Sequence, residues 1–153
     1  VTSSGDVHIN SVDASNVDLS SSSGDLYILK LNAPSLTMAS VSGDIRCDLA
    51  GVSGQVKIDS ATGWSDVTLH SSVTPESLAV HSVSGDCTLT VLDATGIQAK
   101  VVTRTGNVTL PETFTHQVQG NYEGTVGTAP FSNVSIVTVS GDVAVNVSSA
   151  PDA

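Results

Sequence analysis

The sequence is short of aromatic residues, of basic residues and of long apolar runs. Five of its 153 residues are Phe, Trp or Tyr, so any core must be filled by Val, Ile, Leu and Ala. Fifteen Asp and Glu stand against five Lys and Arg, and the net charge of −10 argues against nucleic-acid binding, in which Lys and Arg neutralise phosphates. It argues against anionic membrane surfaces for the same reason. No run approaches about eighteen apolar residues, so we expect no membrane insertion within this chain.

What the sequence does contain is a repeated phrase. Residues 40–44 and 82–86 both read SVSGD, and residues 138–142 read TVSGD. With the glycine as origin, seven units follow one another at spacings of 19, 19, 20, 22, 21 and 35 residues, at Gly5, Gly24, Gly43, Gly63, Gly85, Gly106 and Gly141. Self-similarity at a period of about 20 residues is typical of solenoid proteins, in which each repeat is one structural unit.

Apolar and polar residues alternate on both sides of each glycine. Leu36 and Met38 stand seven and five residues before Gly43, for example, and Ile45 stands two residues after it. This period of two predicts short strands with one buried face. One unit cannot bury that face alone, but stacked coils can. The sequence therefore predicts an all-β fold: a single-stranded parallel β-solenoid (β-helix) of about seven coils, with about 20 residues per coil, forming a single domain over residues 1–153.

The recurring Gly-Asp pair predicts a corner between two strands. Glycine allows a positive φ or a close approach of two backbones. The Asp is expected to close its own corner by an Asx-type bond to a nearby backbone N–H. The fourth unit reads TGWSDVTL, and here we align Ser65-Asp66 with the Gly-Asp pair and interpret Gly63-Trp64 as a two-residue bulge.

The two cysteines, Cys47 and Cys87, are too few to indicate a redox compartment. Both fall in apolar columns of the repeat, two coils or about 9.6 Å apart along the stack. A disulfide requires Cα atoms about 4.4 to 6.8 Å apart. We therefore predict two free, buried thiols.

The SVSGD phrase followed by alternating apolar residues resembles the adhesin family of β-helical, SVSGD-repeat surface domains found in bacterial and fungal proteins. The resemblance covers residues 2–110 and 134–147, and residues 111–133 depart from it. It implies a solenoid at the cell surface or outside the cell, and it implies no particular activity.

A column of carboxylates follows the glycines. Calcium takes several carboxylate oxygens, so the column could bind cations. One Asp per coil supplies too few ligands, however, and we favour side chains that cap corners and point their charge into solvent, with no metal and no cofactor. The members are Asp6, Asp25, Asp44, Asp66, Asp86 and Asp142, with Asn107 in the remaining unit.

Hydroxyl-bearing residues stand three and one positions before every glycine. If the residue between them, such as Val41 or Val83, points inward, two files of hydroxyls line one face, as a carbohydrate- or ice-binding lattice requires. The alternative is a ladder of hydrogen bonds between coils, worth about 0.2 to 1 kcal/mol per pair. The candidate binding residues of this file are Ser40, Ser42, Ser82, Ser84, Thr103 and Thr105.

A catalytic site is the least favoured interpretation. Asp48, Asp59 and Lys57, with His70 and His81 near them, are the residues from which a polysaccharide-cleaving cleft would be built. Glycoside hydrolysis needs a carboxyl pair at a defined separation, with the pKa of one raised by its surroundings. The sequence does not distinguish such a pair from solvated surface charge, so we predict a protein without enzymatic activity.

Residues 111–133 produce the 35-residue spacing and are expected to form an irregular insertion or capping segment. They carry three of the five aromatic residues, Phe114, Tyr122 and Phe131. These side chains either cover apolar surface that the small core residues leave open, or are presented on a loop to a glycan or another partner. They complete the candidate binding residues.

Taken together, the sequence favours a non-enzymatic, extracellular or cell-surface structural or adhesin-like module. The alternatives are a self-associating filament subunit and a carbohydrate- or ice-binding face built on the Ser/Thr file. Expected partners are a glycan or surface polymer and further copies of the chain, and nucleic acid is not among them.

Overall fold

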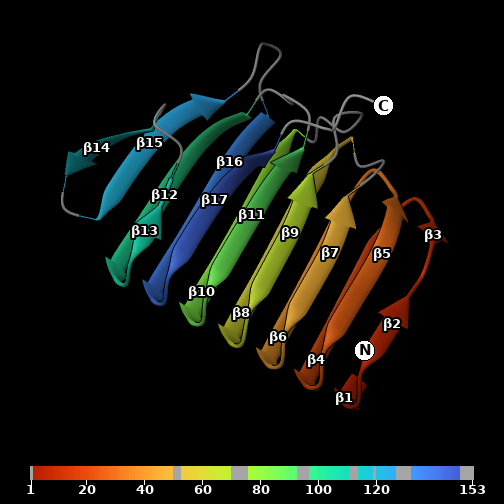
Figure 1. Ribbon diagram of the computed structural model, residues 1–153. Coiled ribbons are helices and arrows are strands. Elements are labelled where there is room, and N and C mark those ends of the chain that lie inside the picture. The colour runs from red at the N-terminus through yellow and green to blue at the C-terminus, as the bar shows by residue number, and fades with distance from the viewer. Residues whose placement is uncertain are drawn as a thin grey trace.

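The computed structural model describes residues 2–49, 53–69, 76–92, 97–110, 114–118, 120–126 and 132–148, and these form an all-β structure of two sheets (Figure 1). Each repeat unit contributes one strand to the first sheet, turns at its Gly-Asp corner and returns in the second. The corners line up along one edge of the molecule (Figure 1). In this described part, no helix has the length and hydropathy needed to cross a membrane.

The first sheet, sheet A, contains nine strands among the described residues. Its strands pair in parallel from β1 to β12, and the last two strands are antiparallel. In spatial order they are β1 (Thr2–Ser4), β4 (Val17–Ser23), β6 (Leu36–Ser42), β8 (Gln55–Thr62), β10 (Ser77–Ser84), β16 (Ser132–Ser140), β12 (Ile97–Thr105), β15 (Asn121–Val126) and β14 (Phe114–Val118).

The second sheet, sheet B, has eight strands in the described ranges, all paired in parallel. In spatial order they are β13 (Val108–Thr109), β17 (Val143–Ser148), β11 (Cys87–Leu92), β9 (Ser65–Leu69), β7 (Ile45–Leu49), β5 (Leu26–Asn32) and β2 (Val7–Ile9), with β3 (Val12–Asp13) also on β5.

The all-β repeat architecture is confirmed, but the prediction of a single-stranded parallel helix is wrong, because the strands form two sheets of mixed order. The seventh unit, β16 and β17, lies between the fifth and the sixth, so β16 separates β10 from β12. The corner glycines follow the same order: a Cβ on Gly141 would meet the carbonyl of Gly85, and one on Gly106 would meet that of Gly141. Sequence spacing defines the units but not the order in which they stack.

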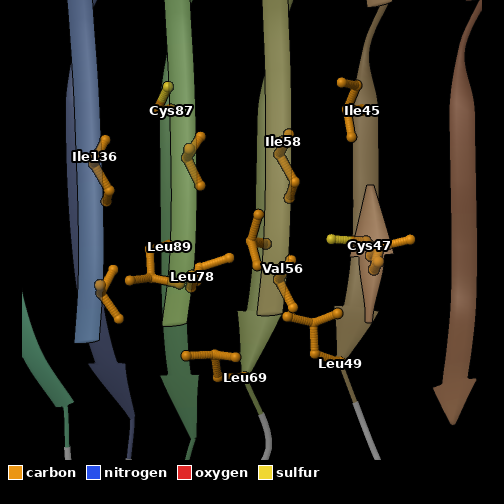
Figure 2. Packing of buried hydrophobic residues seen from close by; sticks show 14 of the residues in the cluster. Ile45, Cys47, Leu49, Val56, Ile58, Leu69, Leu78, Cys87, Leu89 and Ile136 are labelled. Atoms are coloured by element: carbon orange, nitrogen blue, oxygen red, sulfur yellow. The ribbon is translucent and has the colours of Figure 1, made fainter. Parts of the chain in front are cut away.

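The core lies between the two sheets and is aliphatic. The inward positions predicted from the alternation are buried in both layers, and Figure 2 shows Val56, Ile58 and Leu78 of sheet A facing Leu69 and Leu89 of sheet B. Burying one such side chain contributes about 1.5 to 3 kcal/mol. Each coil adds a few of these residues, so the stack is stabilised along its whole length rather than at one centre.

The corner carboxylates do not form the Asx-type bond within their own corner that we expected, but accept a backbone N–H of the adjacent coil. Asp6 Oδ1 accepts the backbone N–H of Asp25 at 3.0 Å, and Asp25 Oδ1 accepts that of Asp44 at 2.8 Å. Asp86 and Asp142 repeat the arrangement toward Asp142 and Asn107 at 2.9 and 2.8 Å. Each carboxylate therefore ties its coil to the next, and we call this row the corner ladder.

The predicted bulge in the fourth unit is also wrong. Gly63 stacks on Gly43, and the Trp64 N–H donates to Asp44 Oδ1 at 2.9 Å, so Trp64 occupies the Asp position of the corner ladder. Ser65 then pairs with Ile45 in the inward column, and Asp66 pairs with Arg46 on the outer face. The dipeptide Ser65-Asp66 resembles the Gly-Asp pair of the repeat, but β9 pairs with β7 in the regular register without a bulge.

The described parts of segment 111–133 include two strands, whose mutual pairing shifts register between His116 and Val118. β14 and β15 form an antiparallel hairpin that pairs with β12, extending sheet A by two strands beyond β13, the last described strand of sheet B (Figure 1). The extra residues in the 35-residue spacing therefore include two strands that extend sheet A. The next described strand is β16, which lies between β10 and β12.

Candidate functional site

An open groove of about 590 Å³ lies on the outer face of sheet A, where β10, β16, β12 and β15 run side by side. Two rows of outward residues cross these four strands. The first row is Ser77, Asn133, Gln98 and Thr125, and the second is Ala79, Ser135, Lys100 and Glu123. We call this the amide groove, because Asn133 and Gln98 stand next to each other at the centre of the first row.

The amide groove exists because of the unexpected strand order. Asn133 reaches Gln98 only because β16 pairs with β12, although 35 residues separate the two positions in the chain. Ala79 and Ser135 contribute short side chains to the lining, and the two amides and the Lys100–Glu123 pair contribute longer ones. The volume is within the range of about 300 to 1,000 Å³ that is usual for small-ligand clefts.

The groove combines apolar surface with several polar side chains, and its charges nearly cancel. Lys100 Nζ lies 3.7 Å from Glu123 Oε1, so the ammonium and the carboxylate offset each other. The side-chain amides of Asn133 and Gln98 each offer donors and an acceptor, and Ser77, Ser135 and Thr125 add hydroxyls that can act as either. Such a surface matches a ligand that carries many hydroxyl groups and no charge.

The two hydroxyl files do not share a face. Ser40, Ser82 and Thr103 are buried, whereas Val41 between the files is 59% exposed. The geometric condition for a two-file lattice, an inward residue between the hydroxyls, is therefore not met. The strand pairing explains this, since it joins Ser82 to Thr138 and Ser84 to Ser140 and skips the residue between, which turns outward.

The buried and exposed hydroxyls also have different partners. Ser82 Oγ donates to Gly85 O and Thr103 Oγ1 to Thr105 O, each within its own corner. In the exposed file, which includes Ser42, Ser84 and Thr105, the hydroxyl of Thr105 donates across the coil boundary to Val139 O at 3.2 Å. The hydroxyls of Ser82, Thr103 and Thr105 thus bind backbone carbonyls at the corners, whereas Ser40 Oγ is buried without a hydrogen-bond partner.

The aromatic candidates of residues 111–133 are only partly described. Tyr122 is half-buried and packs against the core cluster from β15, which is the covering role. The side chain of Phe114 and the whole of Phe131 lie outside the described residues. The same strand contributes Glu123 and Thr125 to the amide groove on its other face.

Only three of the residues considered for catalysis, Lys57, Asp59 and His81, are brought together. Asp59 lies on the outer face of sheet A, where Lys57 Nζ contacts its Oδ2 at 3.1 Å and His81 is its neighbour on β10. Asp48 lies on β7 in the other sheet, and His70 is outside the described residues. Among the described residues, no group of three His, Cys, Asp or Glu side chains is placed to hold a metal ion.

The cysteines are free and buried, as predicted. Burial raises the pKa of the Cys87 thiol to about 11, and it raises that of Cys47 further. Both thiols face the core (Figure 2), so they belong to the packing and not to a reactive site.

Sequence reasoning missed the residues of the amide groove. Gln98, Lys100 and Asn133 occupy outward strand positions that carry no motif, and their neighbourhood depends on the order of the coils. A usable signal was the 35-residue spacing, because a chain that leaves the stack and returns has the opportunity to change neighbours.

Comparison with known proteins gives one family. The family described as Toastrack DUF4097 matches residues 1–146, which is nearly the whole chain. No curated protein and no solved structure matches the chain.

Proposed function

Since the chain belongs to the Toastrack DUF4097 family, we propose its function from the geometry that this fold provides: a non-catalytic, adhesin-like scaffold that binds a neutral glycan in the amide groove. The observation that carries the proposal is the juxtaposition of Gln98 and Asn133 in one row, with the hydroxyls of Ser77 and Thr125 at its ends and the Lys100–Glu123 pair in the row beside it. We place this scaffold at the cell surface or outside the cell, where such polymers occur.

A glycan fits the groove better than a charged ligand. Sugar hydroxyls are both donors and acceptors, as are the amide and hydroxyl groups of both rows. A phosphate or carboxylate ligand would meet one ammonium that Glu123 already neutralises, in a protein whose net charge is −10. The four strands repeat at about 4.8 Å, so the groove offers a regular row of contacts to an extended polymer.

The test is a glycan-array screen followed by calorimetry with the best neutral oligosaccharide. The double substitution Gln98→Ala with Asn133→Ala should weaken binding at least about tenfold, because it leaves sugar hydroxyls without partners in the groove. Gln55→Ala is the matched control: Gln55 is an exposed glutamine that pairs with Ser77 from β8, outside the groove. Equal affinity of the wild type and the double variant would contradict the proposal, and turnover of the oligosaccharide would contradict its non-catalytic part.

Self-association is a second candidate, favoured by the edges of the sheets. Within the described residues, β1 pairs only with β4, and β13 only with β17, so each presents backbone groups along one side. Unpaired edges are templates for strands of another chain. Light scattering over a range of concentrations distinguishes this function, because a filament subunit grows in mass and a glycan-binding monomer does not.

A further inference from the structure

Trp64 is the only tryptophan of the chain, and it is exposed at the corner edge, directly before Ser65 of the inward column. Its side chain is 66% exposed, the largest value among the described large hydrophobic residues that lie at the surface. Gly63 stacks between Gly43 and Gly85, so Trp64 lies in the corner ladder between Asp44 on one coil and Asp86 on the other. The corner position of Trp64 thus lies between two Asp positions on the adjacent coils, each about 4.8 Å away along the stack.

The fourth unit departs from the repeat at two successive positions, Trp64 and Ser65, and neither departure improves the hydrogen bonding of its coil. An Asp at position 64 could accept a backbone N–H of the next coil, as Asp25 and Asp86 do, and tryptophan cannot. Ser65 replaces the apolar residue of the inward column, and its Oγ is buried without a hydrogen-bond partner. A buried unpaired hydroxyl is unfavourable. Local departures of this kind concentrate where a protein binds or reacts.

We propose that Trp64, with the carboxylates of Asp44 and Asp86 on either side, is the docking site for an arginine-rich segment of a partner protein. A guanidinium stacks on the face of an indole and at the same time pairs with a carboxylate. Asp44 Oδ1 is engaged by the Trp64 N–H and Asp86 Oδ1 by the Asp142 N–H, and each carboxylate has a second oxygen for the incoming cation.

Charge complementarity selects this occupant over a second copy of the chain. The protein carries a net charge of −10, and a second copy would bring its own row of carboxylates to the same edge. Like charges opposed across an interface are repelled, whereas a basic segment is attracted. The corner site is separate from the amide groove, which lies on the outer face of sheet A between β10 and β15. The docking site at Trp64 therefore does not depend on glycan binding in the amide groove.

The experiment titrates the protein with a capped arginine pentapeptide at low salt and follows the emission of Trp64, which reports on the site directly because it is the only indole. The corresponding citrulline pentapeptide has nearly the same shape and no charge. We expect a saturable change in emission with the arginine peptide, weakened by added salt, and none with the citrulline peptide. An unchanged emission with both peptides, or the same change with both, would overturn the proposal.

Variants separate the site from general charge attraction, with binding followed by the anisotropy of a labelled arginine peptide. Trp64→Asp restores the ladder residue and should keep the fold while weakening binding at least about fivefold. Asp86→Asn should weaken binding comparably, and Asn already occupies the equivalent position at residue 107. Asp6→Asn, three coils from Trp64 in the same ladder, is the matched control and should bind like the wild type. Equal losses for Asp6→Asn and Asp86→Asn would show unspecific attraction and refute the site.

Discussion

Oδ1 of Asp25 accepts the backbone N–H of Asp44 at 2.8 Å, across the boundary between two coils. The second oxygen of the same carboxylate accepts the hydroxyl of Tyr27 at 3.3 Å, and the Tyr27 ring stacks on His8 of the preceding coil at a centroid distance of 4.7 Å. One carboxylate therefore joins three successive coils at the corner edge.

The corner ladder should therefore contribute measurably to stability. Asp25→Ala removes the acceptor of the Asp44 N–H and should lower the free energy of unfolding by about 1 to 2 kcal/mol. Asp25→Asn keeps an acceptor and should cost less. Urea unfolding measures both, with the exposed Asp13→Ala of β3 as a control expected to lie within about 0.5 kcal/mol of the wild type. A loss as large in the control would show that total charge, and not the ladder, is responsible.

The corner glycines show two different physical reasons why a position requires glycine: a positive φ and the close approach of another backbone. Gly5 has a φ of +118° and open space where the methyl group of an alanine would stand, whereas a Cβ on Gly85 would collide with the backbone of Gly63 although Gly85 is not among the positive-φ glycines. Gly43 combines a φ of +149° with a collision against Gly24. Substitution by Ala should cost about 1 to 2 kcal/mol at Gly5 and at Gly85 and more at Gly43. Thermal melts check the order, and an unchanged melt for Gly43→Ala would remove the corner interpretation.

The buried thiols should be inert in the folded protein. At pH 8 neither Cys47 nor Cys87 should react with Ellman's reagent until guanidinium unfolds the chain, and the intact mass should show no loss of two hydrogens. Because burial raises the pKa of Cys87 from an ordinary 9.0 to about 11, its contribution to stability is complete below about pH 9 and is lost as the pH rises through about 11. Cys87→Val should reduce this alkaline loss of stability. Rapid native reaction would contradict the packing.

Tyr122 should behave as a covering residue of the core. Tyr122→Ala removes a half-buried ring from the core cluster and should lower the free energy of unfolding by about 1 to 3 kcal/mol. Glycan binding in the amide groove should change little, since the ring packs on the opposite face of β15. Thr125→Ala, exposed on the same strand, should leave the melt unchanged. A normal melt with abolished binding would instead make Tyr122 a ligand contact.

The sequence predicted what depends on neighbours within one unit and missed what depends on neighbours between units. The alternation around Gly43 correctly placed Met38, Ile45 and Cys47 inside, because a strand has only two faces. It left the direction of Val41 open, and the strand pairing decides it, because the pairs on either side skip that residue at the corner and it is exposed. Groove residues such as Asn133 and Gln98 meet only through the insertion of β16, and no local pattern encodes which coil a returning strand joins.

The position of β16 also has a consequence for how the chain folds as it is synthesised. The first five units can stack as they emerge, each on the one before, but β10 and β12 acquire their final shared neighbour only after β16 has been made. The link between Asp86 and Asp142 spans 56 residues, and such long-range pairing forms slowly. Until then the edge of β10 that pairs with β16 lacks its final partner. The nascent protein therefore completes its interior by insertion and not by growth at an end.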